Sequence, residues 1–214
     1  MAKTVGADSA RVAILNDADE TVNTKDYAAD FGPTGIFKID ASTSEGLISA
    51  AISGLAPTMN KVYGSDMVVE ESGKGSGSVS VTLAANDIPD PVLNDLTGMK
   101  TDTDSGASFI DTDTRAPYSA LEMTSHDRKG NLVHFAVLKG TFGPEGHELR
   151  TDTDTEQMAT DSVTFGAVNR KSDKKVYAAV NSGQATYAED KWLSLVFPGA
   201  TTTTLPGATT PSKA

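Results

Sequence analysis

Cysteine is absent from this chain of 214 residues, and its absence excludes two kinds of chemistry. No disulfide framework can hold the fold together, and no thiolate can act as a nucleophile or a metal ligand. The apolar share of 38% is adequate for a globular protein but not generous, so we expect part of the stability to come from assembly. A sequence without cysteine also fits synthesis in a reducing cytoplasm.

Long hydrophobic runs are absent as well. No run of about 18 apolar residues occurs, so we expect no membrane span. The first eight residues, Met1–Asp8, contain no apolar core, and the N-terminus therefore does not match a secretory signal peptide.

Positive charge is scarce. Lys and Arg number 18 against 29 Asp and Glu, which gives a net charge of −11 at pH 7. This balance argues against a nucleic acid held on a basic surface, because such a surface needs clustered Lys and Arg. It is compatible with a surface that repels DNA.

Catalytic motifs are missing from the sequence. The three histidines, His126, His134 and His147, show no metal-binding spacing such as H-E-x-x-H. No G-x-S-x-G nucleophile elbow occurs, and Gly73–Gly77 lacks the spacing of a phosphate-binding loop. We therefore expect a protein that is not an enzyme and that holds no cofactor.

Short runs that alternate threonine and aspartate occur at 101–104, 111–114 and 151–154. Asp102 and Asp104 resemble the start of a calcium loop, in which alternate carboxylates converge on a hard cation. The third ligand position and the distal glutamate of an EF-hand are missing. We expect these runs to be solvated acidic loops without a metal.

Hydrophobic alternation predicts a chain built mainly of β-strands. The clearest strand is 78–83, in which three aliphatic residues share one face. Polar residues with Gly130 separate 117–124 from 132–139, which predicts a β-hairpin with a loop longer than two residues. Further strands are expected at 11–15, 36–39, 59–63, 162–168 and 174–180.

One helix is expected at 87–97, and two other segments are ambiguous. Asp87 can cap this helix, its first turn contains prolines, and Gly98 ends it. Residues 43–56 match a helical face slightly better than a strand face by pattern alone. Residues 188–197, which hold the only tryptophan, can form either element.

Composition predicts the domain organisation. Residues 1–10 are expected to be a flexible N-terminal arm, 11–197 a β domain, and 198–214 a disordered tail of low complexity. Residues 64–77 are rich in glycine and serine, and we expect them to form a flexible loop with an apolar tip at Met67–Val69.

Three segments carry a resemblance to a known family. They are an A-P-Y-x-A-L segment at 116–121, an aromatic strand ending in K-G-x-F at 132–142, and a strand closing with valine at 161–168, after an acidic threonine-rich loop. In this order they resemble the major tail protein, or tail tube protein, of long-tailed (siphovirus-type) bacteriophages of Gram-positive hosts. The resemblance covers about residues 36–197, and the 35 residues before it do not contribute.

The resemblance implies a mainly β fold of two packed antiparallel sheets, as a β-sandwich or partial barrel, with one flanking α-helix. It also implies that 43–56 contains a strand, which is the assignment adopted here. Such proteins assemble into stacked hexameric rings that form the tail tube, the conduit for DNA ejection into the host. Their partners are further copies of the chain, the tape-measure protein, the tail terminator and the baseplate or distal tail proteins. Viral DNA passes through the bore without specific binding.

For a protein of this kind, we expect a self-assembly loop that becomes ordered between neighbouring subunits, formed by Met67, Val68, Val69, Glu70 and Glu71. Localisation is then the virion tail, after synthesis in the host cytoplasm. Carboxylates of the central sheet are expected to line the bore, because like charge keeps DNA from adhering.

Two other interpretations remain open. One is an extracellular β-sandwich binding module, whose calcium site would use Asp102 and Asp104. The other is a different ring-forming virion component, such as a tail terminator or a capsid decoration protein.

Overall fold

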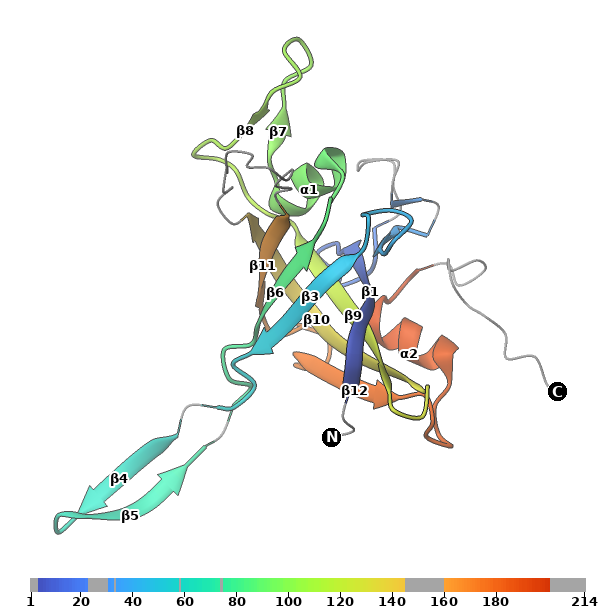
Figure 1. Cartoon of the computed structure of the whole chain (residues 1–214). Coiled ribbons are helices and arrows are strands. Elements are labelled where there is room, and N and C mark those ends of the chain that lie inside the picture. Colours follow the sequence, from blue (N-terminus) through green and yellow to red (C-terminus); the bar gives the residue numbers. More distant parts are fainter. Residues whose placement is uncertain are drawn as a thin grey trace, which may run out of the picture.

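The described residues of the computed structural model are 4–22, 31–32, 34–57, 59–73, 75–144 and 160–200. They form mainly strands, as Figure 1 shows, and the expected mainly β fold is confirmed. The strands are β1 (Thr4–Ile14), β2 (Ile36–Ile39), β3 (Leu47–Ser53), β4 (Asn60–Gly64), β5 (Met67–Ser72), β6 (Ser80–Ala85), β7 (Lys100–Thr101), β8 (Ser108–Phe109), β9 (Tyr118–Asp127), β10 (Leu132–Pro144), β11 (Asp161–Ala167) and β12 (Tyr177–Asn181). The helices are α1 (Asp90–Thr97) and α2 (Glu189–Val196).

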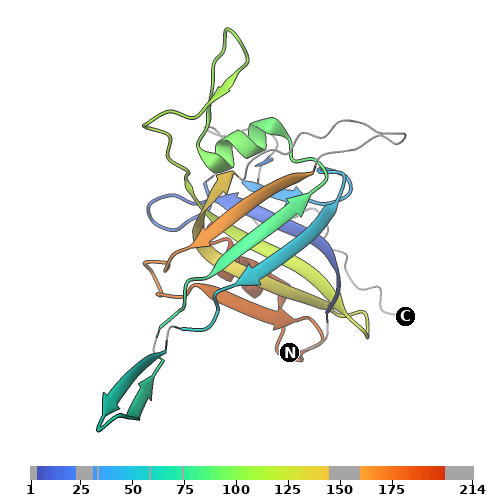
Figure 2. The same ribbon diagram turned by 60° about the vertical axis from the view of Figure 1, so that its left-hand side comes forward.

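The main sheet has eight antiparallel strands in the order β2-β1-β9-β10-β11-β6-β3, with β12 as a further partner of β10. Strand β10 changes partners along its length. Val133–Val137 pairs with β12, whereas Gly140–Pro144 pairs with β11. The sheet therefore folds over at β10 into two layers (Figure 2), which gives the expected sandwich or partial barrel.

The main core lies between these two layers, and α1 closes one end of it. Along β6, Val81 and Leu83 are buried while Thr82 between them is exposed, which is the alternation of a strand with one buried face. The other large members of this core are Val12, Phe37, Ile39, Leu96, Leu121, Met123, Phe142 and Phe165.

A smaller core lies on the outer face of β9 and β10, where α2 packs. Trp192, Leu193 and Val196 of α2 are buried there against Ala120 of β9 and Leu138 of β10. Because α2 covers this face, the central strands are buried on both sides. Only one flanking helix was expected, and α2 is the second; it resolves the ambiguity of residues 188–197 in favour of a helix.

Helix α1 begins later than the sequence indicated. Asp87 does not cap it, since the helix starts at Asp90 with Pro89 in the N-cap position and no side-chain cap. The backbone N–H of Ile88 instead donates to the carboxylate of Asp161 at 2.8 Å, which ties this segment to β11. The expected end at Gly98 is confirmed, with a left-handed φ of 74°. Within the described part of the chain, neither helix is long and apolar enough to cross a membrane.

The N-terminal strand corrects another expectation. Residues 4–10, expected to belong to a flexible arm, are the first half of β1, and Thr4 and Val5 pair with Asp127 and His126 of β9. A register shift between Val5 and Ser9 interrupts the pairing, and this irregularity hides the strand period in the sequence. Residues 201–214, the larger part of the expected disordered tail, lie outside the described residues.

The ambiguous segment 43–56 contains strand β3, so the strand assignment is confirmed. Strand β3 pairs with β6 and lies at the end of the sheet. Leu47, Ala50 and Ile52 face the core and are partly buried, whereas Ala51 is exposed. The pairing between β3 and β6 is irregular between Leu47 and Ser49. This irregularity explains why the apolar residues of 43–56 match neither the helical period nor the strand period well.

Candidate assembly surfaces

The first candidate surface is the hairpin of β4 and β5, which projects away from the body in both ribbon views (Figures 1 and 2). Ser65 and Asp66 form its turn with φ values of 51° and 59°, and two positive φ values define the tight turn that best fits strand twist. The expected flexible loop at 64–77 is therefore wrong. Met67–Val69 does not form a loop tip but begins β5.

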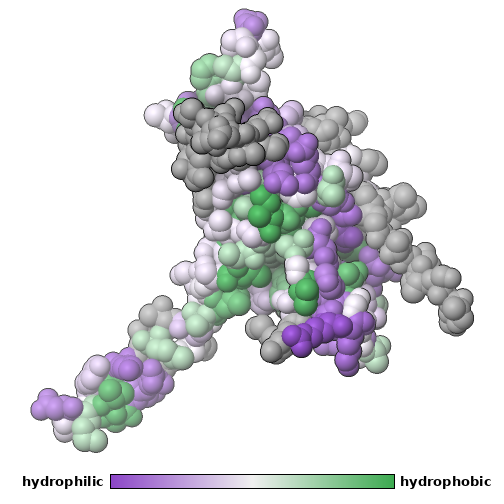
Figure 3. All heavy atoms as spheres, in the orientation of Figure 1, coloured by the Kyte–Doolittle hydropathy of each residue, from purple (hydrophilic) through white to green (hydrophobic). Residues whose placement is uncertain are grey.

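This hairpin carries apolar side chains on both of its faces. Met67 and Val69 are 69% and 70% exposed. The pairing shifts between Val68 and Glu70, which makes Val69 an extra residue of β5. Its Cγ2 lies beside Gly64, the residue directly across from Met67, so Met67 and Val69 are on the same face. Val68 points to the opposite face, where it lies directly across from Tyr63 of β4. Figure 3 shows green atoms on the projecting hairpin, far from the core. A two-stranded ribbon with exposed apolar side chains is marginal in water, so contacts with other chains would stabilise it.

The second candidate surface is the outer face of β3, β6 and β11, which no described helix covers (Figure 2). Cross-strand neighbours on this face form three rows of small or hydroxyl-bearing residues without charge. The rows are Ser53, Ser80 and Gly166; Ala51, Thr82 and Thr164; and Ser49, Ala84 and Ser162.

The expected carboxylates of the central sheet are not on this face. Among the described residues of the central strands, Glu122 is fully buried, and Asp161 at the start of β11 accepts the hydrogen bond from Ile88. Glu122 and Asp161 are therefore not candidates for the bore, and the expectation that carboxylates of the central sheet face it stays a prediction.

A second, smaller hairpin of β7 and β8 lies within the expected polar loop at 99–116. Asn94 of α1 holds it by donating from Nδ2 to Ser108 Oγ at 2.7 Å and to Thr101 Oγ1 at 3.2 Å. Phe109 and Ile110 at its end are exposed. This hairpin leaves the body at the end opposite to the β4–β5 hairpin (Figure 1).

The candidate calcium residues lie in the turn between β7 and β8. Asp102 accepts hydrogen bonds from the N–H and the hydroxyl of Ser105, at 3.0 and 2.6 Å, and these bonds hold the pKa of Asp102 below its usual value. Over the part of the chain that the structure describes, no group of three or more His, Asp or Glu residues converges on a metal position. The run at 151–154 lies outside that part.

A buried polar cluster, not predicted from the sequence, joins β1, β9, β10 and α2. Its centre is Glu122, which is fully buried and within hydrogen-bond distance of Arg11, His134 and Trp192. The Tyr187 hydroxyl lies 3.3 Å from Nε2 of His134. The one signal in the sequence is a glutamate between Leu121 and Met123, in a strand otherwise suited to a core. The cluster is closed to substrates, so its role is structural.

The other two histidines have separate surroundings. His126 lies at the start of the β9–β10 turn, with Nδ1 3.0 Å from the carboxylate of Asp8 on β1. His147 lies outside the described residues. The structure therefore places the two described histidines in different environments, and His134 alone belongs to the buried cluster.

The fold and these surfaces define a class: a β-sandwich structural protein with a projecting, partly apolar hairpin. The model of the phage tail tube protein family matches residues 1–205, and the chain therefore belongs to this family. The match includes the first 35 residues, which the sequence resemblance had left out. Members of the family are structural components of the virion tail and not enzymes, in agreement with the expectation from the sequence. A comparison with curated proteins gives no match.

Proposed function

We propose that this chain self-assembles into stacked hexameric rings, which form the tail tube through which DNA is ejected into the host. The observation that carries the proposal is the β4–β5 hairpin, whose Met67, Val68 and Val69 are exposed to water in the single chain. The three resembling segments support the finer assignment to a long-tailed phage of a Gram-positive host.

In this proposal, residues Met67–Glu71 form the self-assembly contact. Burying an exposed aliphatic side chain such as Met67 contributes on the order of 1.5–3 kcal/mol. Each subunit donates one hairpin and receives one, so the contact is heterologous. Heterologous contacts close into rings laterally and leave the axial direction open, which is the geometry of a tube.

The outer face of β3, β6 and β11 is our candidate for the bore wall. Its hydroxyl and methyl groups offer no cation to a phosphate, and the net charge of −11 repels DNA at longer range. Viral DNA would then pass without specific binding.

The proposed partners are further copies of the chain, the tape-measure protein, the tail terminator and the baseplate or distal tail proteins. The proposed location is the virion tail, after synthesis in the host cytoplasm. In the described run at 101–104, the Asp102 carboxylate is held by Ser105, so this run gives no support to a calcium-binding module.

Negative-stain microscopy and light scattering of the concentrated protein, with and without distal tail proteins as initiator, test this function. We expect hollow tubes of stacked six-fold rings. The double variant Met67→Ser/Val69→Ser should remain monomeric with an unchanged melting temperature. The matched control Ile110→Ser removes an equally exposed aliphatic side chain from the other hairpin and should still form tubes.

Other outcomes point to the other interpretations. Closed rings that never stack, even with the initiator, would indicate a terminator or a decoration protein. A monomer whose melting temperature rises with calcium would indicate a binding module.

A further inference from the structure

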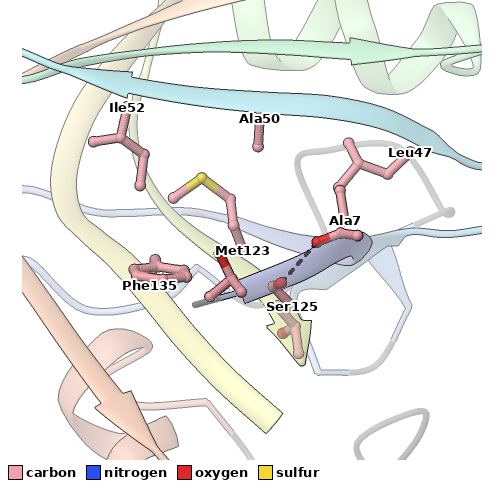
Figure 4. A pocket seen from close by; sticks show the side chains of 10 residues that line it. Ala7, Leu47, Ala50, Ile52, Met123, Ser125 and Phe135 are labelled. Atoms are coloured by element: carbon pink, nitrogen blue, oxygen red, sulfur yellow. Dashed lines mark hydrogen bonds between the residues drawn. The ribbon is translucent and has the colours of Figure 1, made fainter. Parts of the chain in front are cut away.

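A cavity of about 220 Å³ opens between β1 and β3. Figure 4 shows Leu47, Ala50 and Ile52 of β3 above it, and Met123 and Phe135 of β9 and β10 below. Its lining contains no charged residue. We call this cavity the seam socket. An uncharged, mostly apolar hollow at the surface fits the side chains of a partner.

The seam socket exists because the sheet does not close. Among the described strands, β3 pairs with β6 alone, and β1 pairs with β2 only through Ala10–Ala13. The first half of β1 and the whole of β3 therefore face each other as sheet edges without pairing. Ala7 and Ala50, one on each side, have side chains too short to fill the gap.

We propose that the seam socket of one copy receives Met67 and Val69 from the β4–β5 hairpin of a second copy. This inference rests on the proposed function and names the receiving surface for the self-assembly contact. The chain's own hairpin points away from the body in both ribbon views, so it does not fill its own socket (Figures 1 and 2).

Size favours the face of the hairpin that carries Met67 and Val69. At about 30 Å³ for each water-sized group, the socket has room for about seven heavy atoms. The side chains of Met67 and Val69 together contain that number. The opposite face carries Tyr63 with Val68, which together are too large for this volume.

Disulfide trapping tests the inference directly, because the chain has no cysteine of its own. In the double variant Ala50→Cys/Val69→Cys, one cysteine lies in the socket and the other on the proposed hairpin face. Since each copy has one socket and one hairpin, we expect mild oxidation to produce a ladder of covalent multimers on a non-reducing gel. The matched control Ala50→Cys/Val68→Cys shifts the cysteine by one residue to the opposite face and should give at least tenfold less product.

The possible outcomes distinguish the proposed contact between hairpin and socket from the proposed formation of tubes. A ladder from Val69→Cys supports the socket, and microscopy of the same sample before oxidation reports separately on tubes. Tubes without a ladder would overturn the socket and leave the proposed function standing. A ladder without tubes would support the contact between hairpin and socket and would contradict the proposed assembly into a tube. Equal or greater product from Val68→Cys, or from Ala50→Cys/Ile110→Cys, would also overturn the socket.

A second pair of variants blocks the socket without changing the hairpin. Ala50→Phe fills the cavity from β3, and we expect it to reduce assembly at least tenfold at a fixed concentration. Ala107→Phe places the same side chain at an exposed position of the β7–β8 turn, away from the socket and from the proposed bore wall. If the two variants assemble equally well, with both folded by circular dichroism, the socket does not receive the hairpin.

Discussion

The indole Nε1 of Trp192 donates a 2.7 Å hydrogen bond to Oε1 of Glu122, although the two residues are 70 positions apart. This bond fastens α2 to β9. Arg11 Nη1 donates to the other carboxylate oxygen at 3.3 Å, and Nδ1 of His134 lies 2.9 Å from Oε1. Burial alone would raise the pKa of Glu122, but the hydrogen bond with His134 and the charge of Arg11 outweigh it and lower the pKa.

Removal of this carboxylate should be strongly destabilising. Glu122→Ala leaves the buried guanidinium of Arg11 without its acidic partner, and we expect a loss of about 3–5 kcal/mol of unfolding free energy. Urea unfolding followed by the fluorescence of Trp192, the only tryptophan, measures it. Glu122→Gln keeps an oxygen acceptor for Trp192 and should lose less. A loss below about 1 kcal/mol in Glu122→Ala would contradict the central role of this carboxylate.

Stability should also fall in acid. Burial raises the pKa of Asp19, but its bonds with Lys139 and the backbone of Lys171 lower it overall. The bond from Arg170 likewise lowers the pKa of Asp173. A carboxyl group with a lowered folded pKa stabilises the fold above its unfolded pKa, near 4, and loses this contribution as pH falls toward the folded value.

We therefore expect nearly constant unfolding free energy from about pH 7 to 5 and a decline below about pH 4. Denaturant unfolding at a series of pH values gives the curve. Asp173→Asn should lower stability at neutral pH and make the decline shallower, since it removes one titrating group. Equal stability at about pH 3 and pH 7 would show that these carboxylates do not control acid unfolding.

The base of the β4–β5 hairpin offers a further test. Gly54 has a φ of 70°, and a β-carbon there would overlap the carbonyl oxygen of Ser78 on the returning chain. Gly54→Ala should shift the hairpin and reduce tube formation, with the body still folded. Gly106→Ala is the matched control, because Gly106 has a φ of 72° but no atom near the added carbon. Both variants incur about 1 kcal/mol of backbone strain, and only Gly54→Ala must also displace the Ser78 carbonyl. Microscopy should therefore show a loss of tubes in Gly54→Ala alone, with both variants folded by circular dichroism.

The proposed bore wall predicts an effect on DNA passage. Thr82→Lys places a cation in the middle of the β3–β6–β11 face, where phosphates of passing DNA would bind it. We expect phages with this variant to assemble normal tails and to release DNA more slowly, as measured by dye-reported ejection. Thr82→Glu has a side chain of similar reach with the opposite charge and should release DNA normally. Unchanged release from Thr82→Lys would place the bore wall elsewhere.

Simple alternation was enough to predict much of the sheet. Val81 and Leu83 alternate with polar residues, so the position of β6 followed from the side-chain period. Residues 36–39 were predicted with the bounds of β2, because a short apolar run there is enclosed by turn residues. Gly98 marked the end of α1 because its left-handed conformation suits glycine.

The remaining elements depend on tertiary contacts that no local pattern encodes. The tight turn at Ser65 and Asp66 contains no glycine, so the hairpin resembled a loop in the sequence. Glu122 gave no sign of its partners, because Arg11 and Trp192 are far away along the chain. The seam socket arises from strand order alone, since Ala7 and Ala50 become neighbours only once the sheet folds over.

Strand β10 has a mechanical consequence. Because it pairs with β9 along most of its length, and on its other edge with β12 at one end and β11 at the other, a single backbone runs through both layers of the subunit. A force on one layer is transmitted to the other along covalent bonds, so each subunit resists shear as one stiff body. A tube of such bodies would bend at the joints between copies, and the compliance of the conduit would depend on how firmly each hairpin is seated.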